Sequence, residues 1–128
     1  MSAETQPLLN PRLPAPELER WLHLYAGAPK LERHVWLATS GSGGRRKLVA
    51  LGEEALRLSA EAVNRHLEAT SQDVWLLTLP DFHVGGLSLL RRAQQTDSRV
   101  ARLPEWNATN FIEMCEREGV TLSSLVSA

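Results

Sequence analysis

The sequence holds a single cysteine, Cys115, and almost no excess charge of either sign. One thiol excludes an internal disulfide framework and any metal or redox site built on a Cys-x-x-Cys pair. The formal net charge of −1 argues against a polybasic nucleic-acid or membrane binder. No apolar run approaches the roughly 18–20 residues that cross a bilayer, and the first residues lack the basic and apolar regions of a secretory signal. We therefore expect a cytoplasmic protein.

What the chain does contain fits a globular α/β protein. Its 128 residues are 43% hydrophobic and 23% charged, which is typical of a soluble domain. Four of the seven prolines lie in the first 16 residues, which predicts an extended arm with a short apolar anchor at Leu8-Leu9. After the arm, Leu18, Trp21, Leu22 and Tyr25 recur at helical spacing and predict a helix over residues 17–26, ending at Gly27.

From residue 35 onward, predicted strands alternate with predicted helices. Apolar runs predict strands at residues 35–38, 48–51, 73–79, 98–103 and 120–126. Helical periodicity predicts helices over residues 56–67, from residue 87 to 93, and over 107–118, the last capped by Asn107 or Thr109 and stopped by Gly119. This order predicts a mostly parallel sheet flanked by helices. No helix follows the last strand to cover the sheet, so we expect the chain to be one part of a larger unit.

The segment that is most informative about function is Thr39-Ser40-Gly41-Ser42-Gly43-Gly44-Arg45-Arg46-Lys47, a glycine-rich loop between two predicted strands. Glycines let backbone N–H groups approach an anion closely, hydroxyls donate hydrogen bonds, and Lys47 supplies a point charge. These groups together can hold a polyphosphate. A flexible, basic hairpin turn without a ligand explains the composition equally well.

Two common phosphate motifs do not fit this loop. The patterns Gly-x-x-x-x-Gly-Lys-[Ser/Thr] and Gly-x-Gly-x-x-Gly both require glycine where Arg46 stands. Both flanks are predicted strands, so the dipole of a following helix is not the device that would hold an anion here.

The loop resembles the phosphate loop of the AMP-forming adenylating enzymes, which include acyl-CoA synthetases, luciferases and nonribosomal peptide adenylation domains. Their pattern is Thr-[Ser/Thr]-Gly-[Ser/Thr]-[Ser/Thr]-Gly-x-Pro-Lys. This chain departs from it at Gly43, where the family has a hydroxyl residue, and at Arg46, where the family has proline. The first change removes one donor, and the second adds charge and backbone freedom. The chain matches at Thr39, Ser40, Gly41, Ser42, Gly44 and Lys47.

A second segment strengthens the resemblance. Leu79-Pro80-Asp81-Phe82-His83-Val84-Gly85-Gly86-Leu87 is similar to the family's Leu-Pro-Leu-Phe-His-Val-Gly-Gly, and residues 119–128 are similar to a later strand of the family. The likeness covers about residues 34–128 as a partial AMP-binding subdomain and leaves residues 1–33 as a proline-rich arm and short helix. Within the family, the sequence of these motifs most resembles that of the o-succinylbenzoate–CoA ligases of menaquinone synthesis.

The resemblance implies the chemistry of an ATP-dependent acid–CoA ligase. In such enzymes a carboxylate attacks the α-phosphorus of MgATP, pyrophosphate leaves, and the thiol of CoA captures the acyl-adenylate. His83, Gly85 and Gly86 would then lie beside the pocket for an aromatic or other acyl carboxylic acid. No catalytic residue or protein metal ligand is assigned in this chain. The residues implied to hold the nucleotide phosphates are Thr39, Ser40, Gly41, Ser42, Gly43, Gly44 and Lys47.

Structural interpretations of the same residues stay open. His83 also fits a hydrogen-bonded loop histidine, and Gly85-Gly86 a tight turn from a strand to a helix. Cys115 is expected to pack beside Phe111 and Met114 as a small apolar side chain.

The family's later motifs for adenine, ribose and magnesium, its hinge and its C-terminal catalytic lysine do not occur in the 128 residues. We therefore expect the chain to be inactive alone, as a truncated piece of a larger ligase or a natural fragment. The alternative is a non-catalytic phosphate-binding or interaction module derived from the family. Expected partners are ATP or pyrophosphate, an organic acid, and either the remainder of the ligase or a second copy in a homodimer. Neither nucleic acid nor membrane is expected.

Overall fold

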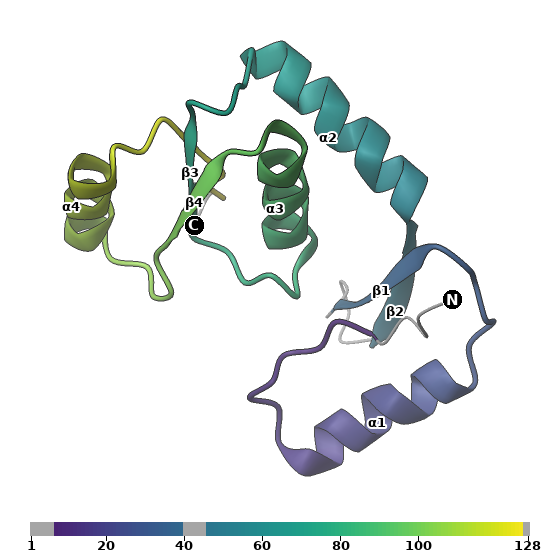
Figure 1. Cartoon of the computed structure of the whole chain (residues 1–128). Coiled ribbons are helices and arrows are strands. Elements are labelled where there is room, and N and C mark those ends of the chain that lie inside the picture. The colour runs from purple at the N-terminus through teal and green to yellow at the C-terminus, as the bar shows by residue number, and fades with distance from the viewer. Residues whose placement is uncertain (1–6, 40–45, 127–128) are drawn as a thin grey trace. The chain divides into compact units, whose positions relative to one another are not determined.

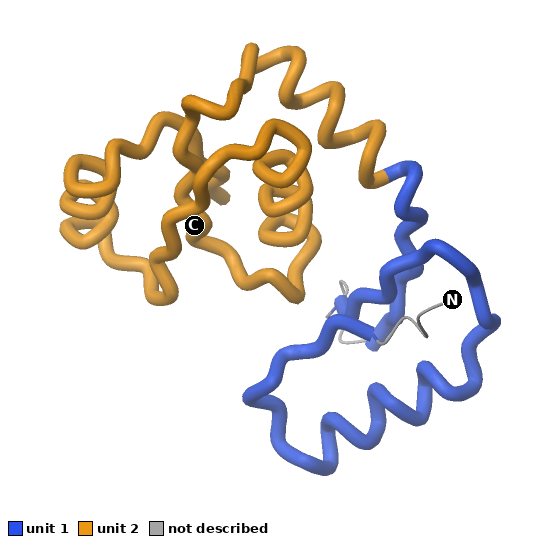
Figure 2. The backbone as a smooth tube through the Cα atoms, viewed as in Figure 1, with its two compact units in different colours: residues 1–55 blue, residues 56–128 orange. Residues whose placement is uncertain are grey.

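The computed structural model describes residues 7–39 and 46–126 of the chain (Figure 1). The chain forms two compact units, residues 1–55 and 56–128, and each is described by itself (Figure 2). This division does not coincide with the boundary at residues 33/34 drawn from the sequence. The reason is that the N-terminal arm pairs with the first strand, where Leu8 forms a parallel bridge to Leu37. The arm therefore belongs to the same unit as that strand.

Unit 1 combines a helix with a β-hairpin. Helix α1 (Ala15–Ala26) starts after Pro14 and ends at Gly27, whose N–H donates to the carbonyl of His23. Strands β1 (His34–Thr39) and β2 (Lys47–Gly52) are antiparallel, with His34 opposite Gly52 and Thr39 opposite Lys47. The Leu8 N–H donates to the carbonyl of Trp36 at 2.9 Å, which confirms the predicted anchor of the arm.

The core of unit 1 is built from α1 and from both faces of β1. Trp21 of α1 and three consecutive residues of β1 (Val35, Trp36, Leu37) are buried. The ring of Tyr25 meets that of Trp36 edge-on, with centroids 6.1 Å apart. Leu22, which shares the helical spacing of Trp21, is 41% exposed.

Unit 2 is a three-stranded parallel sheet with helices on both faces. Helix α2 (Glu53–Leu67) leads into it, and β3 (Val74–Leu77) lies between β4 (Arg99–Arg102) and β5 (Leu122–Ser123). Helix α3 (Val84–Thr96) connects β3 to β4, and α4 (Ala108–Glu118) connects β4 to β5 (Figure 1).

The alternation of side chains along β3 explains why both faces are covered. Trp75 and Leu77 point to one face and pack with Leu89 and Ala93 of α3. Leu76 points to the other face and packs with Ala101 and Leu103. The α4 residues predicted to face inward, Phe111, Met114 and Cys115, pack against this second cluster.

The α/β class is confirmed, and the sheets are smaller than the sequence predicts. The pair β1–β2 is antiparallel, so unit 1 has only the isolated Leu8–Leu37 bridge as parallel pairing among its described residues, and the paired parallel strands lie in unit 2. Strand β5 has two residues, whereas residues 120–126 were predicted to be extended. The limits of α4 match the prediction: the Asn107 side chain accepts a hydrogen bond from the Asn110 N–H, and Gly119 is left-handed with φ 66°. No helix in the described residues is long and apolar enough to cross a membrane.

A carboxylate fastens β5 to β3. The Thr121 hydroxyl donates to Asp73 at 2.8 Å, and the Thr121 N–H donates to the carbonyl of Val74 at 2.9 Å. Asp73 also accepts the N–H of Thr70 at 2.8 Å. The bond from the Thr70 N–H, followed by that from Thr121, lowers the pKa of Asp73, because both bonds favour the ionised carboxylate.

This arrangement predicts the pH dependence of the variant Asp73→Asn. A carboxyl whose pKa is lowered by folding stabilises the folded state above its unfolded pKa of about 3.9 and loses that contribution as the pH falls through its folded pKa. The wild type should therefore have the higher urea midpoint between pH 5 and 7, and the two midpoints should converge as the pH falls below about 4. Asp81→Asn, in an exposed turn, is the control. A gap between wild type and Asp73→Asn that persists at low pH would contradict this account.

Candidate functional site

The structure describes the two ends of the glycine-rich loop. Thr39 and Lys47 are cross-strand partners at the loop end of the β1–β2 hairpin, so their backbones lie on the order of 5 Å apart. Lys47 is exposed and Thr39 is half-buried. The residues on either side of the loop belong to two strands, as predicted, and these strands are antiparallel, which the sequence did not predict. Five of the predicted phosphate-binding residues, Ser40, Gly41, Ser42, Gly43 and Gly44, lie outside the described residues.

The register also determines which face each end of the loop occupies. The Trp36 ring contacts Tyr25 of α1, so the even-numbered side chains of β1 point toward α1. Their cross-strand partners on β2 share that face, as Ala50 does opposite Trp36. Thr39 and its partner Lys47 are odd-numbered, so they alternate with the side chains that face α1. Their side chains therefore share the face of the hairpin that is turned away from α1.

Arg46, immediately before Lys47, is held by helix α1. Its Nη2 donates to Oε1 of Glu17 at 3.3 Å, and its Cζ lies 5.9 Å from the centroid of the Trp21 ring. An exposed ion pair contributes about 0.2–1 kcal/mol, and a cation–π contact at an exposed site adds about 0.5–1 kcal/mol. Sequence reasoning missed this contact. Its only signal was the departure of Arg46 from the family's proline.

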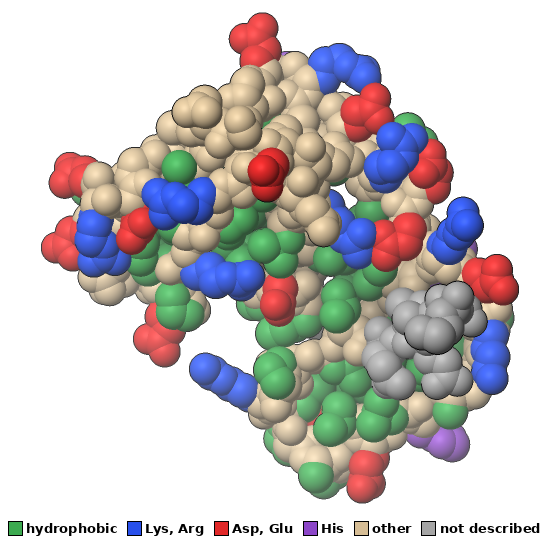
Figure 3. Space-filling model, viewed as in Figure 1, with side chains coloured by type: hydrophobic (Ala, Val, Ile, Leu, Met, Phe, Trp, Pro, Cys, Tyr) green, Lys and Arg blue, Asp and Glu red, His purple; other side chains and the backbone are tan. Residues whose placement is uncertain are grey.

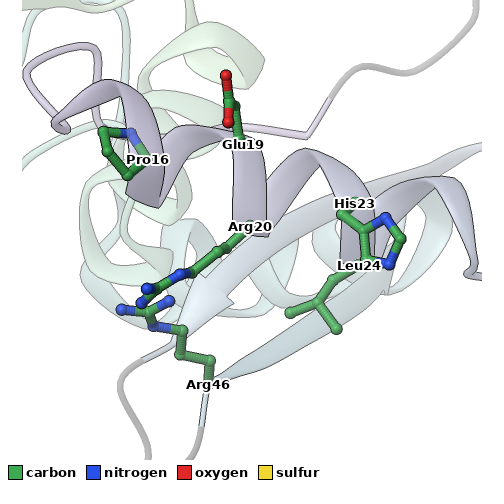
Figure 4. Close-up of a pocket in the computed structure, with 6 residues that line it drawn as sticks. All are labelled: Pro16, Glu19, Arg20, His23, Leu24 and Arg46. Carbon is green, nitrogen blue, oxygen red and sulfur yellow. The ribbon is translucent and has the colours of Figure 1, made fainter.

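A shallow groove runs along α1 beside Arg46 (Figure 4). The guanidinium groups of Arg20 and Arg46 lie at one end of it, and the carboxylate of Glu19 points away from them (Figure 4). Over the face shown in Figure 3, acidic and basic side chains are interspersed. The groove is lined by Pro16, Glu19, Arg20, His23, Leu24 and Arg46.

The second motif forms the connection from β3 to α3. His83 is the N-cap residue of α3; its side chain is exposed and makes no capping hydrogen bond. Its ring contacts that of Phe82, with centroids 4.9 Å apart. The His83 N–H donates to the carbonyl of Pro80 at 3.2 Å. The backbone of His83 thus completes the turn, and its imidazole is exposed to solvent.

Gly85 and Gly86 belong to the first turn of α3, which starts three residues before the predicted start at Leu87. A Cβ on Gly86 would lie 2.0 Å from the carbonyl oxygen of Pro80, so only glycine allows the helix to approach this backbone. A Cβ on Gly85 would lie 2.6 Å from Cδ1 of Leu79, which is the movable end of a side chain. This geometry favours the interpretation of the glycines as a tight strand-to-helix turn.

The glycine-rich loop belongs to unit 1 and the segment from Leu79 to Leu87 belongs to unit 2. Within residues 7–39 and 46–126, no group of three or more His, Cys, Asp or Glu side chains is placed to hold a metal ion.

Comparisons with known proteins show which proteins the chain as a whole resembles. No family model matches the sequence. The chain is 36% identical over 89 residues to the 2-succinylbenzoate–CoA ligase of Bacillus mycoides, covering 70% of this chain and 18% of that protein. It also matches the O-succinylbenzoate Coenzyme A synthetase (MenE) of Bacillus subtilis in complex with ATP and magnesium, at 30% identity and a TM-score of 0.67, covering 73% of this chain and 20% of the other. The chain belongs to the AMP-forming acyl-CoA synthetase family.

A second solved structure of the family extends the match along the chain. The complex of Bacillus subtilis MenE with the acyl-adenylate intermediate OSB-AMP gives a TM-score of 0.69 at 25% identity and covers 88% of this chain and 34% of that one. The resemblance stated from the motifs is thereby confirmed. The chain spans less than a fifth of the length of the curated relative.

The contacts of the two glycines predict unequal effects of adding a methyl group. Gly86→Ala should lower the free energy of unfolding by about 1–3 kcal/mol, because the backbone of Pro80 and the helix would have to separate. Gly85→Ala is the matched control, since the Leu79 side chain can rotate away and alanine favours the helix. Urea unfolding followed by circular dichroism measures both. Equal effects would show that the approach to Pro80 is not what requires glycine.

Proposed function

We propose that this chain is the phosphate-loop part of an AMP-forming acid–CoA ligase that acts on o-succinylbenzoate. The observation that carries the proposal is the motif from Thr39 to Lys47, which closes an antiparallel hairpin in a chain similar to such ligases. Residues 34–128 would form part of the adenylating subdomain, and the complete enzyme would use CoA as the second acceptor and act in the cytoplasm. The phosphate-binding residues would be Thr39, Ser40, Gly41, Ser42, Gly43, Gly44 and Lys47.

The described ends of the loop have the chemistry that a polyphosphate requires. Thr39 offers a hydroxyl, and Lys47 offers an ammonium group on the same face of the hairpin. Among the described residues, no acidic cluster is placed to hold the magnesium ion that accompanies the nucleotide. MgATP supplies the adenylyl group to the acid. The role of Lys47 would be to stabilise the negative charge that develops on the departing pyrophosphate.

The second motif would border the acid. His83 has an exposed imidazole at the start of α3, where it can donate a hydrogen bond to a carboxylate. Gly85 and Gly86 carry no side chain that would occupy this end of the helix. Because the absence of a Cβ at Gly86 is already required by Pro80, His83 is the member of the motif whose side chain is available to a ligand.

The first test measures pyrophosphate binding to Lys47→Ala by isothermal titration calorimetry. Loss of one charge-assisted hydrogen bond should weaken binding roughly ten- to a hundredfold. Lys30→Ala is the matched control, because Lys30 and Lys47 are the two lysines of the chain and Lys30 lies outside the motif. No measurable binding by the wild type, or equal binding by Lys47→Ala, would contradict a phosphate loop.

The second test asks whether the 128 residues can adenylate an acid. Catalysis by positioning requires all reacting groups to be held together, and the motifs expected to hold adenine, ribose and magnesium do not occur in the sequence. Single-turnover mixtures with ATP, magnesium and o-succinylbenzoate should therefore contain no acyl-adenylate by mass spectrometry. Formation of acyl-adenylate would overturn this prediction. Binding of pyrophosphate without adenylation is also what the non-catalytic module would show.

A further inference from the structure

Arg46 occupies the position at which the family's loop pattern has proline. Proline restricts φ to about −65° and so limits the conformations of the backbone just before the lysine. Arginine imposes no such restriction, because its backbone samples the full range open to an ordinary residue. Contacts of the Arg46 side chain, in addition to the pairing of Lys47 with Thr39, can supply the local order that proline would otherwise give the backbone before Lys47.

Those contacts are made with one face of helix α1. Glu17 and Trp21 are four residues apart and so lie on the same side of the helix. Trp21 is only 7% exposed, which makes its ring a fixed platform for the guanidinium of Arg46. Glu17 accepts a hydrogen bond from the same guanidinium at 3.3 Å. The side chain of Arg46 is therefore held at two points by a helix 25 or more residues away in sequence.

The direction of this contact is what matters for Lys47. Successive side chains of extended backbone point to opposite faces. Arg46 points toward α1, on the face shared by Trp36, whereas Lys47 lies on the other face with Thr39. Docking of Arg46 on α1 thus orients Lys47 away from the helix. The guanidinium itself is engaged with Glu17 and Trp21, on the side opposite to Lys47.

We propose that Arg46 is a positioning residue for phosphate binding: Glu17 and Trp21 hold its side chain, and this fixes the backbone from which Lys47 reaches the anion. The inference rests on the proposed function, because it assumes that Lys47 contacts pyrophosphate. It gives helix α1 a role in the site, although α1 precedes both sequence motifs. In this chain a contact between side chains replaces the restriction that proline would impose.

The first experiment titrates pyrophosphate into the whole chain and its variants Glu17→Gln and Arg46→Ala. Each variant should bind about three- to tenfold more weakly, the range expected for loss of one exposed ion pair with its cation–π contact. The double variant should bind no more weakly than Arg46→Ala, because both changes break the same contact. Glu19→Gln is the matched control: it removes a carboxylate from the same helix that points away from Arg46 (Figure 4).

A second variant separates positioning from direct contact with the anion. Arg46→Pro removes the charge and restores the family's backbone restriction. Positioning predicts that Arg46→Pro binds pyrophosphate within about threefold of the wild type and that adding Glu17→Gln to it changes nothing. If the guanidinium instead touched the anion, Arg46→Pro and Arg46→Ala would weaken pyrophosphate binding equally, because both remove it. Thermal unfolding of each variant confirms that it is folded at the temperature of the titration.

The outcomes distinguish this inference from the proposed function. Wild-type binding that depends on Lys47 but is unchanged by Glu17→Gln would overturn the positioning role and leave the phosphate loop intact. Equal weakening in Arg46→Pro and Arg46→Ala would overturn it in favour of direct contact. If the wild type does not bind pyrophosphate, or Lys47→Ala binds it equally well, the proposed function and this inference fail together.

Discussion

The antiparallel register of β1 and β2 is the constraint on which the candidate phosphate site depends. It pairs Thr39 with Lys47 at the loop end of the hairpin and assigns both to one face. A shift of one residue would turn Lys47 toward α1 and Arg46 away from it. The register is itself secured on the other face of β1 by burial of Trp36 against α1, and by the bridge between Leu8 and Leu37. Packing around a single strand therefore decides where the charge of Lys47 is presented.

The sequence predicted those elements whose local pattern and tertiary environment agree. The run over residues 73–79 contains the central strand β3, which is buried on both faces, and Asn107 and Gly119 cap α4 as expected. Prediction failed where a distant contact overrides local preference. Consecutive glycines disfavour a helix, so α3 was predicted to start at Leu87. The close approach to Pro80 makes glycine necessary inside its first turn.

Sequence patterns also did not predict polar contacts between residues that are far apart along the chain. Asn64 interrupts the apolar stripe of α2 and is nevertheless buried, because its Nδ2 donates to the carbonyl of Arg92 at 3.1 Å. The contact from Arg46 to Glu17 joins residues 29 positions apart. Neither pair has a periodicity that could reveal it. The loop motif could be recognised because its chemistry is concentrated in nine consecutive residues, whereas the contact that orients it comes from a separate helix.

A motif shared with a family mixes residues kept for packing with residues kept for ligands, and the structure helps to separate them. Gly86 is fully explained by the backbone of Pro80, so its presence is no evidence for a substrate. Arg46 is explained by its contacts with α1. Lys47 is exposed, and within the described part of the chain no hydrogen bond or ion pair of its side chain accounts for it. The proposed anion binding therefore depends on this lysine, at the end of a loop rich in glycine and hydroxyl groups. Lys47 thus carries more of the functional argument than either glycine does.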